Sequence, residues 1–498
     1  MIEKVRHKGL ALAILATAQF MVVLDATIVN VALPAIQKAL NFQGDASLQW
    51  VITAYALAFG GFLLLGGRLA DLYGRRRLFL AGAILFAIAS FAGGIAQNPS
   101  QLILFRAIQG LGGALLSPAA LSLVLTIFKE GPERNKALGV WSMVAAGGGA
   151  VGLMLGGLLT QYIDWRWIFF INIPIAIAVV IAGLKYVPAS LPRERESVDY
   201  LGAITITGSL MSLVFGLAKA AENGWGAAPT IYAFITSAVL MIWFIVNEMR
   251  VRHPLIRLGI FRQRNVTGAS IVMLLMPAAM FGLFFYLSIF LQQVLGYSPT
   301  HTGVANLPFT LTIMVVAATL SRRAASINPK AVLVAGPLLA AIGLLYFARV
   351  PVHAHYWTDI LPGIVIMASG MAMVFVTATL AATSGVSHKE SGLVSGLLTT
   401  GQQIGGAIGL AALTVISTAA TRNHMPVAAD QFASYQAIMA DSLVYGFHRG
   451  FIAAAGFAVL ASIVALLVFK VNTAPALDEQ TSGEAQRELA EAAPAANL

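Results

Sequence analysis

Long apolar stretches alternate with short polar segments along almost the whole chain of 498 residues. Each stretch has about 20 residues, the length at which an α-helix crosses the hydrocarbon core of a bilayer. In lipid such a segment must be helical, because its backbone polar groups find no water to bond. The pattern predicts fourteen spans, at residues 10–33, 48–67, 78–97, 100–122, 137–160, 167–187, 201–221, 229–248, 266–291, 302–320, 331–350, 358–382, 391–418 and 446–469.

The composition strengthens this interpretation. Hydrophobic residues make up 58% of the chain and charged residues only 10%, too few polar groups to cover a soluble protein of this size. The chain has no cysteine, which excludes disulfides, thiolate metal sites and a cysteine nucleophile. The histidines show no metal-ligand spacing, so we predict no metal site. The sequence therefore predicts an all-α polytopic membrane protein.

The distribution of lysine and arginine predicts the orientation. With a cytoplasmic N-terminus, 24 of the 31 basic residues lie in inside segments, six lie outside, and Arg106 alone lies within a span. Such asymmetry is typical of inner-membrane proteins and places both termini in the cytoplasm. The net charge of +10 is thus a topology signal spread over eight segments, which argues against a nucleic-acid partner.

Two polar stretches, 188–200 and 247–266, divide the chain. They bracket two spans and leave six spans on either side, as in transporters built from two six-helix halves around a midplane cavity. We expect an N-terminal six-helix bundle at 1–190, two inserted spans with cytoplasmic linkers at 191–265, and a C-terminal six-helix bundle at 266–470. Residues 471–498 are expected to form a solvated, disordered cytoplasmic tail.

Asp25 is the one acid placed well inside a predicted span, and Arg106 is the one base. A carboxylate there is expensive, by about 2.5–3.5 kcal/mol on insertion scales, and usually faces a cavity or a partner. At ~1.5 Å per residue the two side chains lie roughly 12 and 9 Å below the same surface, so they can face each other. We predict that Asp25 carries a proton and that Arg106 modulates it; the alternative is a purely structural carboxylate and cation.

The segment Gly67–Arg77, GRLADLYGRRR, joins the second and third spans. Its glycines permit a tight turn, its acid can face a helix N-terminus, and its arginines can hold the cytoplasmic face shut through ion pairs. A generic positive-inside loop would explain the arginines alone. We predict a gating role for Gly67, Asp71, Gly74, Arg75 and Arg76.

Four motifs together resemble one family. Residues 67–77 resemble the loop signature of the major facilitator superfamily, and residues 106–113, RAIQGLGG, resemble its fourth-helix arginine motif. Residues 24–34, LDATIVNVALP, and 164–174, DWRWIFFINIP, resemble the fourteen-span drug:proton antiporters of the EmrB/QacA type. The resemblance implies a major facilitator fold and proton-driven export of drugs, with a link to antibiotic resistance.

Two departures from that family qualify the expectation. The fifth-helix antiporter motif, usually Gly-Pro-x-x-Gly-Gly, retains Gly152, Gly156 and Gly157 but has Leu153 in place of proline. That motif is associated with export, so the direction of transport stays open. The counterpart loop of the second half, at 321–323, has no acid, and no acid lies within the spans of that half, which favours monovalent cationic, neutral or zwitterionic amphiphiles.

Polar and aromatic side chains inside spans are candidates for the substrate cavity, since such surfaces suit promiscuous apolar ligands. For most of them lipid contact or helix packing is the competing explanation. The candidates are Met21, Asn30, Trp50, Tyr55, Gln109, Trp141, Phe281, Phe285, Tyr286, Gln292 and Gln402.

We therefore predict a secondary transporter, not an enzyme, that exports amphipathic small molecules in exchange for protons. No nucleotide-binding loop of the form G-x-x-x-x-G-K-[ST] is present, so no cofactor is expected and the proton gradient supplies the energy. Its partners are the substrate, protons and the bilayer; a periplasmic adaptor stays open. The alternatives are a narrow-specificity metabolite exporter or importer and, from another class, a lipid scramblase or a membrane-embedded enzyme.

Overall fold

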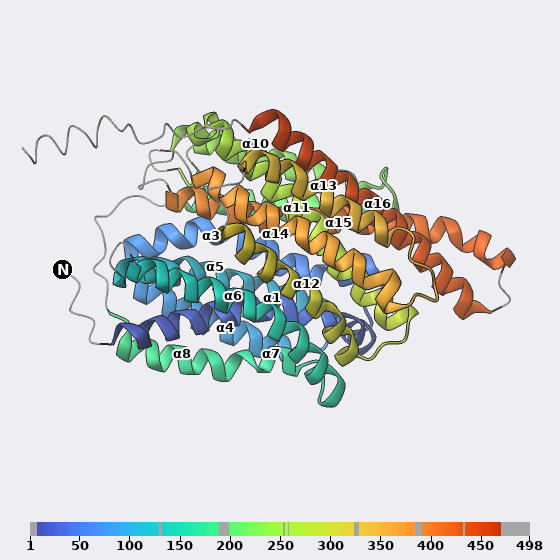
Figure 1. The fold of residues 1–498 in the computed structure, drawn as a ribbon, viewed down its shortest axis with the longest axis horizontal. Coiled ribbons are helices and arrows are strands. Elements are labelled where there is room, and N and C mark those ends of the chain that lie inside the picture. The colour runs from blue at the N-terminus through green and yellow to red at the C-terminus, as the bar shows by residue number, and fades with distance from the viewer. Residues whose placement is uncertain are drawn as a thin grey trace, which may run out of the picture.

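The computed structural model describes residues 7–128, 132–188, 199–251, 254–256, 258–322, 328–383, 391–431 and 434–469. Within these ranges every regular element is a helix, and the long helices run along one common axis (Figure 1). The predicted 471–498 tail and most of the first linker lie outside the described residues. The all-helical fold class predicted from hydropathy is confirmed.

The N-terminal half contributes six long helices and two short ones (Figure 1). Helix α1 runs past the predicted end of its span and contains Pro34, and it ends at Asn41, whose positive φ of 56° terminates the helix. The helices are α1 (Lys8–Leu40), α2 (Asp45–Leu48), α3 (Trp50–Tyr73), α4 (Arg75–Gly94), α5 (Pro99–Ile127), α6 (Pro132–Tyr162), α7 (Trp167–Phe170) and α8 (Asn172–Tyr186).

The C-terminal half repeats this plan and contains two π-helical turns. Its helices are η1 (Leu258–Arg262), α11 (Arg264–Ile289), η2 (Phe290–Val294), α12 (Pro299–Arg322), α13 (Pro329–Phe347), η3 (Tyr356–Ile360), α14 (Leu361–Thr383), α15 (Ser391–Gln431) and α16 (Tyr435–Val468). The last two are longer than predicted, because α15 continues through polar residues after the apolar run ends. Their joined ends project beyond the rest of the bundle (Figure 1).

Between the halves lie α9 (Tyr200–Asn223) and α10 (Ala228–Arg250). Helix α9 packs against α3 of the first half, α15 of the second half and α10. This placement agrees with a pair of inserted helices at the seam between two bundles, although the domain boundaries stay a prediction.

Thirteen of the described helical segments are long and apolar enough to cross a membrane. Helix α6 is not among them, although it has 31 residues and packs lengthwise against α1 and α12. The protein is therefore a multi-pass membrane protein, and the count of fourteen spans stays a prediction.

Glycines set the closest helix contacts, and they do so in the same way in both halves. A methyl group on Gly156 of α6 would lie 2.5 Å from the carbonyl oxygen of Ile28 on α1. A methyl group on Gly405 of α15 would lie 2.0 Å from the carbonyl oxygen of Leu274 on α11. Only glycine allows backbones to approach this closely, which is a common feature of membrane helix packing.

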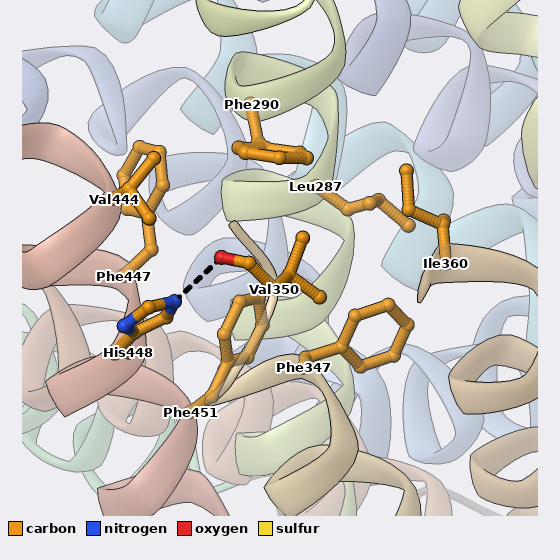
Figure 2. Close-up of a pocket in the computed structure, with 9 residues that line it drawn as sticks. All are labelled: Leu287, Phe290, Phe347, Val350, Ile360, Val444, Phe447, His448 and Phe451. Atoms are coloured by element: carbon orange, nitrogen blue, oxygen red, sulfur yellow. Dashed lines mark hydrogen bonds between the residues drawn. The ribbon is translucent and has the colours of Figure 1, made fainter. Parts of the chain in front are cut away.

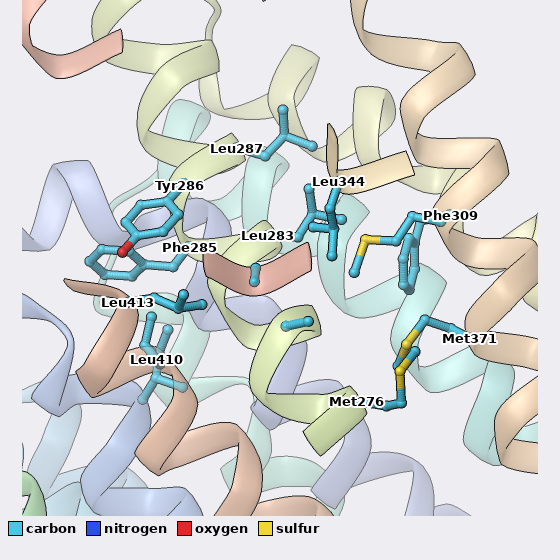
Figure 3. Close-up of a cluster of buried hydrophobic side chains, with 14 of the residues drawn as sticks. Met276, Leu283, Phe285, Tyr286, Leu287, Phe309, Leu344, Met371, Leu410 and Leu413 are labelled. Atoms are coloured by element: carbon cyan, nitrogen blue, oxygen red, sulfur yellow. The ribbon is translucent and has the colours of Figure 1, made fainter. Parts of the chain in front are cut away.

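The halves meet through equivalent pairs of helices, α3 with α15 and α6 with α12. One cluster of buried apolar side chains includes residues of both halves, and a second lies within the first half. The part of the shared cluster drawn in Figure 3 lies in the second half and is built from aliphatic, aromatic and methionine side chains on α11, α12, α13, α14 and α15. Such a core buries no charge and needs no polar partner.

Candidate functional site

Asp25 on α1 and Arg106 on α5 form a salt bridge inside the N-terminal half. Arg106 Nη1 lies 2.6 Å from Asp25 Oδ2. The exposed fractions of the two residues are 1% and 0%, so the pair is sealed from solvent in this conformation. The two residues that sequence reasoning placed at similar depth are thus in direct contact.

Two amides complete the surroundings of the Asp25 carboxylate. Its Oδ1 accepts hydrogen bonds from Gln109 Nε2 at 2.7 Å and from Asn172 Nδ2 at 2.9 Å. Every group that contacts the carboxylate in these bonds is a donor. An ionised carboxylate only accepts hydrogen bonds, whereas a protonated one also carries an O–H that needs an acceptor. The arrangement therefore fits the charged form of Asp25.

Arg106 is held from several sides. Its Nε donates to the carbonyl oxygen of Val51 at 2.9 Å, and its Nη1 also donates to Gln109 Oε1 at 2.8 Å. The guanidinium carbon lies 4.3 Å from the centre of the Tyr55 ring, within the range of a cation–π contact. A desolvated cation is costly unless its donors are occupied, and these bonds occupy the Nε donor and both Nη1 donors.

Ser90 on α4 links the amides to the α7–α8 junction. Its hydroxyl donates to the carbonyl oxygen of Phe169 at 2.8 Å and accepts from Gln109 at 3.1 Å and Asn172 at 3.0 Å. The network therefore connects α1, α4, α5 and α8 around one buried charge pair.

Sequence reasoning missed Ser90 and gave Asn172 no role, and it assigned Gln109 to the cavity wall. The i, i+3 spacing of Arg106 and Gln109 on one helix was a usable signal, because such residues lie on one face. Asn172 lies in the 164–174 motif, which was a signal, although the motif does not indicate contact with Asp25; for Ser90 the sequence offers no signal.

The predicted gating residues attach the α3–α4 turn to the N-terminal half itself. Gly74 has φ 98°, in the region that favours glycine, and it allows the sharp turn between the helices. Arg75 donates to the carbonyl oxygen of Ser122 and to the hydroxyl of Thr126 on α5, and Arg76 donates to the carbonyl oxygen of Leu184 on α8. The side chain of Asp71 lies outside the described part, and the gating role stays a prediction.

The fifth-helix motif lies where α6 crosses two partners. Gly152 and Gly156 face α1, and a methyl group on Gly157 would lie 2.6 Å from the carbonyl oxygen of Pro299 at the start of α12. The helix is continuous through Leu153, whose carbonyl oxygen would lie 2.4 Å from a methyl group on Gly303 of α12. Without the proline, α6 retains its backbone bonds and packs tightly across the two halves.

The predicted cavity residues fall into three groups. Met21, Tyr55, Phe285 and Tyr286 are buried within the cores, and Trp50, Trp141 and Phe281 are partly buried against them. The polar residues bond to helices: Asn30 to Ala26 and Thr27, Gln292 to Val31, and Gln402 to Met273. Neither of the two cavities described below is lined by these residues, so their assignment to a substrate cavity stays a prediction.

Two further acids are buried at the linker end of the inserted helices. Asp199 caps α9 by accepting from the Gly202 N–H at 2.7 Å, and it accepts from Asn247 Nδ2 at 2.7 Å. Glu248 on α10 accepts from the Ile256 N–H at 3.1 Å. Sequence reasoning had treated both as residues at span ends. The structure shows that Asp199 ties α9 to α10 and that Glu248 ties α10 to the following linker.

Comparisons with known proteins agree with this architecture. The puromycin resistance protein pur8 of Streptomyces alboniger is 39% identical over 95% of this chain and 93% of its own length. The cephamycin export protein CmcT of Amycolatopsis lactamdurans is 36% identical over 82% of this chain and 85% of its own length. Among solved structures, the POT family transporter PepTSo matches with a TM-score of 0.67 at 15% identity, covering 94% of this chain and 98% of that chain, which shows a shared fold.

The family model described as Major Facilitator Superfamily matches residues 15–410, most of the chain. That match includes the Asp25 network, the α3–α4 turn and the glycines of α6. Two curated relatives cover more than four fifths of the chain at identities above one third. The chain therefore belongs to the major facilitator superfamily of membrane transporters.

Proposed function

We propose that this protein exports amphipathic small molecules, antibiotics among them, in exchange for protons. In this proposal it is a fourteen-span drug:proton antiporter with both termini in the cytoplasm and with α9 and α10 as its inserted pair. The names of its relatives, a puromycin resistance protein and a cephamycin export protein, support export of drug-like cargo.

The observation that carries proton coupling is the environment of Asp25. Its carboxylate accepts from Arg106, Gln109 and Asn172, side chains of α5 and α8. A proton on Asp25 cancels the charge that Arg106 compensates and turns one acceptor oxygen into a donor. The bonds between α1 and its two neighbours must then rearrange, so proton binding favours a different packing of these helices.

The second half supports a single coupling site. Among its described residues, no charged side chain of α11–α16 is buried, whereas the first half buries Asp25 and Arg106. Alternating access then needs only this site for coupling. The cavity opens outward and Asp25 takes a proton. After reorientation, Asp25 releases that proton to the cytoplasm as substrate binds. Substrate and proton shift the same conformational equilibrium in opposite directions, so the protein exchanges one for the other across the membrane.

Everted membrane vesicles test this proposal. With an acid interior, wild-type protein is expected to load puromycin against its gradient, and Asp25→Asn is expected to abolish the loading while the protein stays folded. Asp164→Asn is the matched control, because Asp164 is an exposed carboxylate that pairs with Arg166. Loading by Asp25→Asn at the wild-type rate would remove Asp25 from the mechanism, and absence of loading by wild type would contradict antiport.

A second candidate is an exporter dedicated to one compound. The relatives reported above are named for single antibiotics, which favours narrow specificity. Competition distinguishes the two: a broad exporter loses puromycin loading when ethidium or a cephamycin is added in excess, whereas a dedicated exporter does not.

A further inference from the structure

A cavity of the second half lies away from the Asp25 network, at the outer ends of the helices. It has a volume of about 660 Å³ and lies beneath the first turns of α16, beside η2 and the segment before η3. This volume falls within the range of sites that enclose drug-sized ligands. Lining residues include Gln293, Val352, His353, Tyr435, Met439 and Asp441.

The wall of this cavity combines one carboxylate with apolar and aromatic groups. Asp441 Oδ2 lies 2.9 Å from His424 Nε2 on α15, which fixes the carboxylate at the cavity edge. The His424 ring stacks on Tyr445, with ring centres 4.1 Å apart. The nearest described cation on this helix, Arg449, is engaged with Tyr445, whose hydroxyl accepts from its Nη2 at 2.7 Å. Asp441 is therefore the charge that an occupant of the cavity meets.

Residues adjacent in sequence to this wall line a second cavity. It has a volume of about 10 Å³, room for roughly one water molecule, and its lining includes Phe290, Phe447 and Phe451 (Figure 2). His448 lies 2.8 Å from the carbonyl oxygen of Val350 and ties α16 to the chain after α13 (Figure 2).

The cavity also adjoins the seam between the two halves. Gln293, which lines it, donates through Nε2 to Gln37 Oε1 on α1 at 3.0 Å. One turn deeper, Ser288 Oγ donates to the carbonyl oxygen of Asn30 at 2.6 Å. These bonds hold α1 and α11 together at this end, so they must break when the transporter opens there. A molecule released through the opened seam would pass this cavity.

We propose that this cavity is an outer binding site for amphipathic organic cations, with Asp441 as the anionic contact and Tyr435 and Met439 as apolar contacts. The site is separate from the central pathway. It rests on the proposed function only in that an exporter delivers its cargo to this side.

Single-cysteine labelling tests the site, because the natural chain has no cysteine. In purified full-length Met439→Cys, tetraphenylphosphonium is expected to slow maleimide labelling, whereas tetraphenylborate, of the same shape and opposite charge, is not. Adding Asp441→Asn is expected to raise the tetraphenylphosphonium concentration needed for protection about fivefold, which corresponds to ~1 kcal/mol for a partly exposed ion pair. Asp359→Asn is the matched control, because this η3 carboxylate accepts from the His355 N–H and is not among the residues that line the cavity, so it is expected to change nothing.

Three results would overturn the proposal. One is equal protection by both ions, which would mean an apolar crevice without charge selectivity. The second is the absence of protection, and the third is protection that Asp441→Asn leaves unchanged. Trp225→Cys, at an exposed position between α9 and α10, is the unprotected control. The labelling assay uses no proton gradient, and it can also be run on protein that carries Asp25→Asn. A failure of this binding site is therefore distinguishable from a failure of proton antiport.

Discussion

The two halves of this transporter have the same helix packing but different interiors. In both, glycines of the fifth helix bring it against the first helix of the half, at Gly156 on α6 and at Gly405 on α15. The first half encloses a salt bridge with three amide or hydroxyl partners, and the second encloses an apolar core (Figure 3). The packing therefore does not depend on the buried charges. A feature that folding does not require is a candidate for function.

The largest effect on the difference between the two interiors is expected when the buried cation of the first half is removed. Arg106→Met is expected to lower the free energy of unfolding by about 3–5 kcal/mol, because it leaves a buried carboxylate without its counter-charge. Thermal unfolding of the purified protein measures the effect. The double variant Asp25→Leu/Arg106→Met removes both buried charges, while Gln109 and Asn172 keep their bonds to Ser90, and it is expected to recover much of this loss without transport. A double variant as unstable as the single one would contradict the view that packing is independent of the pair.

A smaller effect is expected from the amides. Asn172→Ala removes a donor to a charged carboxylate, and such bonds contribute about 1.5–3 kcal/mol. The matched variant in the second half is Asn306→Ala, because Asn306 is also buried but donates to the carbonyl oxygen of Thr302 on its own helix. That neutral bond contributes only about 0.5–1.5 kcal/mol. Equal losses in melting experiments would show that Asp25 does not strengthen the bond to Asn172.

Substitution of the packing glycines tests the close helix contact that the two halves share. Gly156→Ala and Gly405→Ala are each expected to destabilise by about 1–3 kcal/mol, since the added methyl meets a backbone carbonyl and the helices must move apart. Similar losses from the two variants would support equivalent packing. Gly456→Ala on α16 is the control, because its added methyl meets no atom within 4 Å. A large loss in the control would mean that helix packing is not the cause.

The smallest effect is expected from a volume-conserving change in the apolar core of Figure 3. Met371→Leu keeps volume and polarity and is expected to change stability by less than about 1.5 kcal/mol. Met371 is fully buried, so Met371→Ala, which leaves a cavity, should cost about 2–5 kcal/mol. The ratio of these two losses, from unfolding in detergent, shows how tightly this core is packed; equal losses would indicate a fluid interior.

Several features could be predicted from the sequence alone because their causes are local. Hydropathy placed the long helices, and the scarcity of charge drew attention to Asp25 and Arg106. Helix α15 ends at Gln431, 13 residues beyond the predicted span, because a helix can continue through polar residues once it leaves the apolar region. Hydropathy predicts which part of a helix can lie in lipid, but it does not predict where the helix ends in water.

The sequence by itself determined the helical class, the membrane location and the identity of the buried charge pair, because lipid penalises unpaired polar groups wherever they occur. Only the tertiary structure decided which groups satisfy that pair. Ser90 and Asn172 come from α4 and α8, and the network exists because packing brings four helices to one point. The outer cavity beside Asp441 likewise forms from three separate segments. A hydrogen-bond network or a cavity depends on distances between distant residues, and those distances are set only when the helices pack.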